Sequence, residues 1–355
     1  ADEALLDHLL EEPFQVETAE LASEPVLASA VRTAELALTG RVKIFGSEVD
    51  LGESPDWLAD PAGSGSAAGL KNLPAWSESY TATGLDIRSI WELNRLHVLV
   101  ELGRAWQLTR REEFASLAVR WITGWNEQNP FGRTVNWSSA LEVSLRAISL
   151  LVAVNCLRDS QSLQDKGLRA MLARLFYLHG EYIANHTSPP SSGFNHLAGE
   201  AAGLALLGEY LPGMNPSAGW RIEGLALLRQ SVQRLIFPDG GGLEGSLHYL
   251  SFVCRLASVV TLLCGRSVQD LLGREGAERL RAAYSFMAEM TDGGRAISEY
   301  GDSDDAWLPG TGPEGLGEHY RGTLNLLWLL GGSNDLRHEF SPDPDSVWLY
   351  GSEKG

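Results

Sequence analysis

The sequence predicts an all-α protein, and three observations support that prediction. Apolar residues recur at helical spacing along most of the chain, and the stretch 88–108 is a clear example. Strand signals are few and short; the best lie at 41–45 and 347–350. The breaks between apolar stretches are short and rich in Gly, Pro and Ser, as at 188–193 and 238–242. Together these features indicate helices joined by tight connections.

The apolar periods predict the following helices in chain order: 26–39, 88–108, 112–127, 138–157, 162–185, 196–210, 218–236, 246–265, 275–291 and 315–331. Short loops between successive helices indicate antiparallel hairpins, which could assemble as a bundle, a solenoid or a closed (α/α) toroid. The absence of a repeat at a fixed period counts against a regular solenoid. Residues 46–84 are rich in Gly, Ser and Pro, so we expect them to pack over the helices or to serve the function.

Charge and composition exclude several classes of protein. Lys and Arg number 28 against 46 Asp and Glu, a net charge of −18, which argues against nucleic acid as a partner. No apolar run reaches the roughly 18 residues that span a bilayer, so we expect no membrane partner. Hydrophobic residues make up 44% of the chain, enough for a large core. The three cysteines are too few for a disulfide framework or a four-cysteine zinc site.

No cofactor or metal site is expected, and the tryptophans hint at carbohydrate. The eight histidines include no His-x-x-x-His pair, and the acidic run at 301–305 lacks the later residues of a calcium loop. Seven of the eleven tryptophans fall between Trp57 and Trp137. Trp57, Trp76 and Trp137 lie in loops or at helix starts, where an indole can face a cleft and stack on a sugar ring. Packing in the core is the alternative for each of them.

The first polar cluster lies at the start of the stretch 88–108. Arg88, Glu92 and Arg95 are spaced i, i+4 and i+7, so they share one helix face. The face could be a salt-bridged solvent surface. Alternatively, it binds an anionic substrate, because Arg grips a carboxylate or sulfate through two hydrogen bonds and Glu92 would fix the arginines.

The second cluster, Asn195-His196, directly follows the loop 188–193. Asn195 stands where a helix N-cap is expected, and the apolar run that starts at Leu197 follows it. The pair could be a cap and a packed first-turn residue. A helix N-terminus also offers unpaired N–H groups to a carboxylate, and the amide and imidazole would add donors.

The third cluster follows the glycine-rich loop 239–242. Glu244 lies in the connection, and His248 and Tyr249 lie in the first turn of the next predicted helix. We expect Glu244 and His248 to contact the substrate. Tyr249 is either an ordinary helix tyrosine or a proton donor or base near the Asn195 loop.

Taken in order, these clusters make the chain resemble the heparinase II/III-like polysaccharide lyases. The matching blocks are DIR-x-x-WELNR at 86–95, NPFGRTVNWSSALEVSLRAIS at 129–149, NHLAGEAAGL at 195–204, DGGGLEGSLHY at 239–249 and GDSDD at 301–305. The resemblance covers roughly residues 42–350. It implies an (α/α) toroid, here incomplete, which in the family precedes a β-sandwich domain.

The resemblance also assigns roles and boundaries. It implies that Asn195 binds the uronate carboxylate, that Tyr249 is the catalytic acid, and that His196 helps to neutralise the carboxylate. We expect N-terminal helices and a packed segment at 1–84, the toroid at 85–340, and the start of a linker or of a β-sandwich at 341–355. The family takes a further catalytic His from its β domain, so 1–355 alone should act weakly on uronate polymers. A periplasmic or secreted location is expected rather than a cytoplasmic one.

The expected reaction is β-elimination on an acidic polysaccharide. A lyase must remove the C5 proton of a uronic acid and expel the 4-linked sugar, so donors must stabilise the developing enolate. Two alternatives remain open at this point. A glycoside hydrolase on the same fold would need two carboxylates, with candidates Glu92, Glu244, Asp302 and Asp304. A non-catalytic glycan-binding module would need none.

Overall fold

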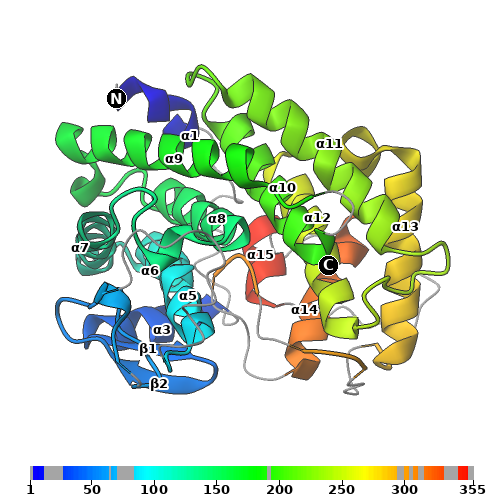
Figure 1. Ribbon diagram of the computed structural model, residues 1–355, viewed down its shortest axis with the longest axis horizontal. Helices are drawn as coiled ribbons and strands as arrows, with labels where there is room; N and C mark the ends of the chain where they lie inside the picture. The colour runs from blue at the N-terminus through cyan, green and yellow to red at the C-terminus, as the bar shows by residue number, and fades with distance from the viewer. Residues whose placement is uncertain are drawn as a thin grey trace.

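The computed structural model describes residues 3–11, 27–63, 65–69, 84–189, 193–293, 300–303, 307–310, 316–331 and 343–350. It confirms the predicted all-α architecture. Successive helical hairpins follow one another around an arc, as in an incomplete toroid (Figure 1). In the described ranges the strands form a single two-stranded sheet, β1 (Arg41–Ile44) and β2 (Ser47–Asp50). The expectation of few strands therefore holds for this part of the chain.

The helices form an inner and an outer layer. Nearly every described side chain of the inner helices is buried, whereas the outer helices bury only one face. The inner helices are α6 (His97–Thr109), α8 (Ala140–Cys156), α10 (Phe194–Tyr210), α12 (Leu247–Leu263) and α14 (Leu316–Leu329). The outer helices are α7 (Glu112–Gln128), α9 (Lys166–His186), α11 (Ser217–Leu235) and α13 (Val268–Met290).

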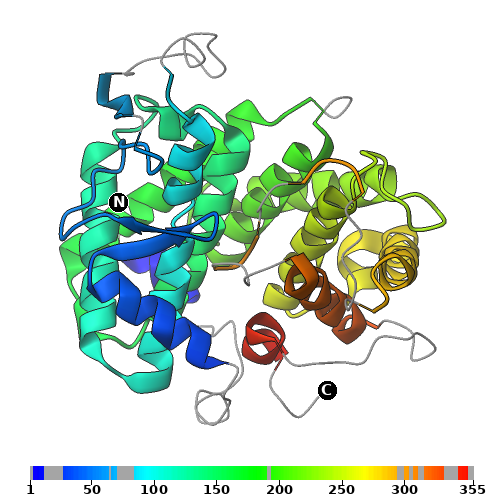
Figure 2. The ribbon, with the colours of Figure 1, turned by 90° about the horizontal axis from the view of Figure 1, so that it is seen from below.

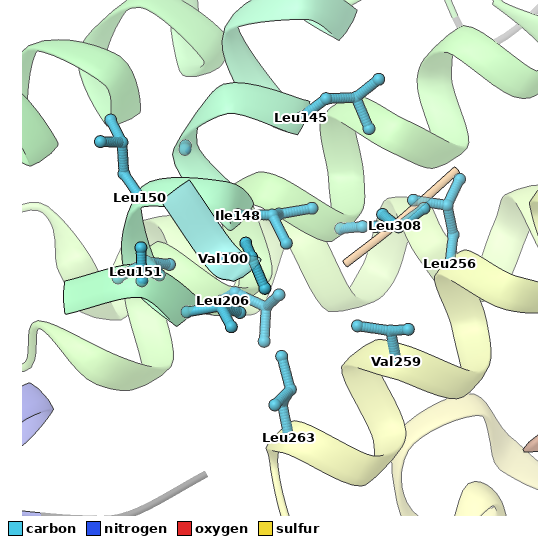
Figure 3. Packing of buried hydrophobic residues seen from close by; sticks show 14 of the residues in the cluster. Val100, Leu145, Ile148, Leu150, Leu151, Leu206, Leu256, Val259, Leu263 and Leu308 are labelled. Atoms are coloured by element: carbon cyan, nitrogen blue, oxygen red, sulfur yellow. The ribbon is translucent and has the colours of Figure 1, made fainter. Parts of the chain in front are cut away.

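Small residues let neighbouring helices approach closely in this arrangement. A Cβ at Gly208 or Gly224 would lie 2.3 or 2.4 Å from a backbone nitrogen of the facing helix in the α10–α11 hairpin. Apolar side chains from four inner helices fill the interior, among them Val100, Ile148 and Leu206 (Figure 3). The core is therefore continuous along the inner layer, and each inner helix is held on both sides.

The predicted helix 88–108 is broken in the structure. It divides into α5 (Ile87–Asn94) and α6, because Leu96 adopts a left-handed conformation with φ of 58°. The apolar stripe continues through the break, so periodicity alone could not reveal it. The break places the polar face of α5 beside the start of α8, where Arg95 meets Glu142.

The N-terminal residues pack against the first helices. The described elements there are η1 (Glu3–Leu6), α1 (Asp7–Glu11) and α3 (Ala28–Leu38), followed by the β1–β2 hairpin. Its two-residue turn, Phe45-Gly46, has positive φ at both positions. Short 3₁₀ turns occur at η3 (Ala67–Gly69), η4 (Val135–Trp137) and η5 (Gln161–Leu163). Trp76 lies outside the described residues.

The predicted strand at 347–350 is wrong, because these residues belong to helix α15 (Pro344–Tyr350). Its buried carboxylate, Asp345, accepts hydrogen bonds from Arg104 of α6, from Arg255 of α12 and from the indole of Trp307. Two views show α15, in red, between the N-terminal helices and α14 (Figures 1 and 2). We call Asp345, Arg104 and Arg255 the α15 clasp. The boundaries at 84 and 340 stay predictions.

Candidate functional site

The starts of the inner helices gather at one end of the arc. Each hairpin reverses direction, so every second helix runs the same way and begins at the same end. Contacts between residues near those starts bear this out: Asn195 reaches Glu244, and the rings of His248 and His319 lie 4.5 Å apart. The polar blocks that contain Asn195, Glu244 and His248 therefore lie at one end of the arc, where His319 also lies, although 124 residues separate His319 from Asn195 in sequence.

Asn195 is held by Glu244 in the loop before α12. Its amide Nδ2 donates to Glu244 Oε1 over 2.8 Å, and the Asn195 side chain is 8% exposed. Burial raises the pKa of the Glu244 carboxyl, while hydrogen bonds from the side chain and backbone of Asn195 lower it; burial prevails. The expectation that Asn195 caps its helix is wrong, because α10 begins at Phe194 and its N-cap is Gly193. Its amide is therefore available for contacts across the site.

Tyr249 lies in the first turn of α12 and is fixed at both ends. Its backbone N–H donates to Ser246 Oγ over 3.1 Å, the N-cap hydrogen bond of the helix. Its phenol Oη donates to Asp302 Oδ2 over 2.6 Å. Ser246 Oγ also donates to the backbone carbonyl of Asp302. The hydroxyl of Tyr249 thus points at a carboxylate near the start of α12.

Two glycines bring Asp302 against the start of α12. A Cβ at Gly301, whose φ is +79°, would lie 2.0 Å from the carbonyl oxygen of Gly245. Only glycine permits this approach. Asp302 is thereby placed beside Tyr249, whereas Asp304 falls outside the described residues.

His196 and His248 occupy different environments. His196 is exposed on the first turn of α10, next to Asn195, where it can meet a substrate. His248 is 1% exposed and packs against His319, whose ring in turn lies 4.5 Å from Trp307. Burial argues against direct substrate contact by His248, and its ring instead supports the first turn of α12 from behind.

Nearby carboxylates neutralise part of the positive charge on the polar face of α5. Arg95 donates to both oxygens of Glu142, over 2.7 and 2.9 Å, and also pairs with Glu92. Glu92 therefore does hold an arginine, as the spacing predicted, but Arg95 is shared by two carboxylates. Arg88 is exposed on the first turn of α5. Of the two arginines, Arg88 has the greater surface to offer an anion.

Trp137 is a core residue, contrary to its predicted place on a cleft. Its indole is buried, and its N–H donates to the carbonyl of Asn129 over 3.1 Å. Phe131 packs across it with ring centroids 5.0 Å apart and is itself 44% exposed. In this loop Phe131, and not Trp137, is exposed enough to contact a sugar.

Sequence reasoning missed several residues at this end of the arc. Glu142 neutralises Arg95, and His319 packs on His248. Phe194 precedes Asn195 directly and has an exposed ring. Its position next to the polar pair Asn195-His196 could have indicated a place in the site. The helical pattern of the surrounding residues instead favoured a packed core residue.

Among the described residues, no three His, Cys, Asp or Glu side chains are grouped as metal ligands would be. The three cysteines are reduced thiols; Cys156 and Cys254 are buried and Cys264 is half-buried. Within the part of the chain that the structure describes, no helix combines the length and apolarity that a bilayer crossing demands.

Comparisons with known proteins agree with the fold described above. The family model described as Heparinase II/III N-terminus matches residues 16–307. A heparin-sulfate lyase of Bacteroides thetaiotaomicron is 24% identical over 205 residues, which are 56% of this chain and 29% of that protein. A heparin-sulfate lyase of Bacteroides stercoris is 23% identical over 203 residues, 52% of this chain and 29% of that protein. The chain thus spans under a third of the length of these relatives.

A solved structure shows the same fold. Heparan sulfate lyase HepC from Pedobacter heparinus superposes with a TM-score of 0.57 at 18% identity, over 79% of this chain and 42% of that one. The likeness identifies the helical domain as an (α/α) toroid of this type. Because the family model covers most of the chain, the chain belongs to the heparinase II/III N-terminal family.

Proposed function

We propose that this chain carries the helical part of a polysaccharide lyase that cleaves uronic-acid-containing polysaccharide by β-elimination. The observation that carries the proposal is that two polar groups lie at the starts of neighbouring inner helices. The Asn195 amide lies at the start of α10 and the Tyr249 hydroxyl at the start of α12, and Glu244, just before α12, bonds to Asn195. The relatives named heparin-sulfate lyases support the same class of substrate.

Asn195 would stabilise the negative charge that develops on the uronate. The C5 proton must pass to a base, which by the family resemblance would be a histidine of the β domain. As that proton leaves, charge moves onto the carboxylate oxygens, and hydrogen-bond donors must be in place to stabilise it. Glu244 accepts from one N–H of the Asn195 amide, so the amide nitrogen retains a second N–H for the substrate. His196, exposed on the same turn, would add a further donor.

Tyr249 would protonate the leaving oxygen of the 4-linked sugar. A phenol is a competent acid without a change in its pKa, because it carries its proton at neutral pH. Its hydrogen bond to Asp302 orients the hydroxyl before substrate arrives, and the proton turns to the glycosidic oxygen in the complex. Arg88 would meet anionic groups farther along the polymer. Arg95, Glu92 and Glu142 would keep α5 in place.

Three of the four carboxylates that a hydrolase could use are already engaged, and the fourth, Asp304, lies outside the described residues. Glu92 pairs with Arg95, Glu244 accepts from Asn195, and Asp302 accepts from Tyr249. Each of these carboxylates is held by a partner and can position that partner. A hydrolase instead needs one carboxyl group as an acid and a second as a base or nucleophile. We therefore favour elimination over hydrolysis.

The test is to incubate the chain with heparan sulfate and with alginate, and to follow ultraviolet absorbance and reducing ends together. A lyase raises both signals, because elimination creates a C4–C5 double bond. A rise in reducing ends alone would identify a hydrolase. Because residues 1–355 alone should act weakly, the assay uses a high concentration of the chain and long incubation. Binding with neither signal under those conditions would identify a glycan-binding module, and both of these outcomes contradict the proposal.

A pair of tyrosine variants sharpens the test. Tyr249→Phe removes the transferable proton and should lower turnover by about 10²–10⁴-fold. Tyr177→Phe is the matched control, since Tyr177 is exposed on the outer helix α9. Equal turnover in the two variants would remove Tyr249 from the mechanism.

A further inference from the structure

Phe194 occupies a backbone conformation that a bulky side chain rarely adopts. Its φ is +47°, in the left-handed region that favours glycine. It is also 42% exposed, so burial of the ring does not offset the strain. A strained, exposed aromatic residue is a reason to look for a function.

The helix start itself does not require this conformation. The residues that begin a helix ordinarily have negative φ, as Gly193 has here with φ of −73°. Phe45 shows the contrast, because its φ of +49° belongs to a two-residue β-hairpin turn that needs positive φ at both positions. Phe45 therefore has a local explanation. Phe194 belongs to no such turn among the described residues; Leu96 also has a positive φ at a helix start, but it is fully buried in the core, whereas Phe194 is exposed.

The place of Phe194 in the fold links it to the candidate site. It directly precedes Asn195, whose amide contacts Glu244. The guanidinium of Arg234, near the end of α11, lies over the Phe194 ring at 5.6 Å from its centre. The loop that follows α11 leads to Glu244 and α12. The ring thus lies at the end of the arc where the inner helices begin, with a cation against it.

We propose that Phe194 is a stacking platform for the sugar ring next to the uronate that Asn195 would hold. The flat apolar face of a phenyl ring suits the C–H face of a pyranose. Arg234 adds positive potential beside that ring, as an anionic polysaccharide requires. Phe194 is 42% exposed, while Asn195, the next residue, is 8% exposed and donates to Glu244. This assignment rests on the proposed function, because it names a further subsite of the same site.

Two substitutions by glycine test the platform, and both relieve the same kind of backbone strain. Phe194→Gly and Phe45→Gly each remove an exposed ring and each relieve a positive φ, so their unfolding midpoints should shift alike. Phe194→Gly should raise KM for heparan sulfate oligosaccharides about tenfold, with kcat changed far less. Phe45→Gly should leave both constants at the wild-type values, and Phe194→Tyr should restore KM.

Binding to a non-cleaving background separates this subsite from the lyase reaction. In the Tyr249→Phe background, calorimetric titration with a heparan sulfate tetrasaccharide should show the same loss on adding Phe194→Gly. If the wild-type chain binds but does not cleave, and Phe194→Gly weakens binding, the lyase proposal fails and the platform stands. If the wild-type chain cleaves and Phe194→Gly behaves as Phe45→Gly does, the platform is overturned and the lyase proposal stands. A wild-type chain that neither binds nor cleaves refutes both.

Discussion

Replacing Asp345 by Asn should destabilise the protein strongly, because the α15 clasp places one carboxylate between two buried arginines. Arg104 Nη2 donates to Asp345 Oδ1 over 2.6 Å, and Arg255 together with the Trp307 indole donates to Oδ2. The side chains of Arg104 and Arg255 are 2% and 0% exposed. Burial lowers the pKa of Arg255 to about 10 despite Asp345, so it stays charged at neutral pH.

The loss in free energy of unfolding can be estimated from the cost of leaving two buried arginines without their carboxylate. Breaking a buried ion pair by removing one partner costs about 3–5 kcal/mol in the free energy of unfolding. An unfolding entropy of about 2 cal/mol/K per residue makes that loss a fall of about 4–7 °C in Tm for a chain of this length. Asn retains the shape of Asp and can still accept a hydrogen bond from one arginine. The substitution therefore measures the effect of losing the charge while the packing stays the same.

Urea unfolding followed by far-ultraviolet circular dichroism, together with calorimetry, measures both quantities. Asp159→Asn is the matched control: Asp159 is 64% exposed, and its nearest cation, Arg158, lies 3.8 Å away. That control should change the free energy of unfolding by less than about 0.5 kcal/mol. A loss below about 1 kcal/mol in Asp345→Asn would refute the idea that the clasp holds α15 in place.

Two further predictions concern the candidate site, and a third concerns a buried carboxyl group of α10. Asn195→Ala should reduce turnover by about 10²–10³-fold with little change in Tm, since Gly193 is the N-cap of α10; steady-state kinetics and calorimetry check the two parts. Glu244→Gln, whose carbonyl can still accept from the Asn195 amide, should keep more turnover than Glu244→Ala, and equal rates would show that Glu244 does not position Asn195. Glu200 is buried and accepts from Ser188, and burial raises its pKa from 4.5 to about 6. Because the folded state holds that proton more tightly, the stabilising effect of the proton is present below pH 4.5 and is lost as the pH rises through 6. Glu200→Gln should therefore remove about 2 kcal/mol of this pH dependence, measured as unfolding free energy at pH 4 and pH 7.

The sequence was sufficient to predict most of the helices. The period of apolar residues placed α8, α10 and α12 within a few residues of their observed ends. It failed where a tertiary requirement overrode the pattern. The left-handed Leu96 interrupts a continuous stripe, and the apolar run at 347–350 forms a helix because Asp345 is drawn into the clasp.

The candidate site was predictable as a set of blocks, but not as an arrangement. Adjacent helix starts explain why Asn195 and Glu244 meet, and hairpin topology is enough to expect this. The partner of Tyr249 was not predictable, because Asp302 reaches it only through the close approach of two glycine backbones. The burial of Trp137 was missed because its loop folds under Phe131, and the local sequence contains no sign of that cover.

The clasp also has a consequence for the order in which the chain folds. Hairpins such as α10–α11 join residues that are near in sequence, so they can form early and independently. The contact between Arg104 and Asp345 spans 241 residues, which is a large loop to close. Docking of α15 onto α6 and α12 should therefore come after the hairpins have formed. Before that step the arc of hairpins should exist without the α15 clasp. Until α15 docks, two cationic side chains of the interior are still hydrated, and their dehydration belongs to the last step of folding.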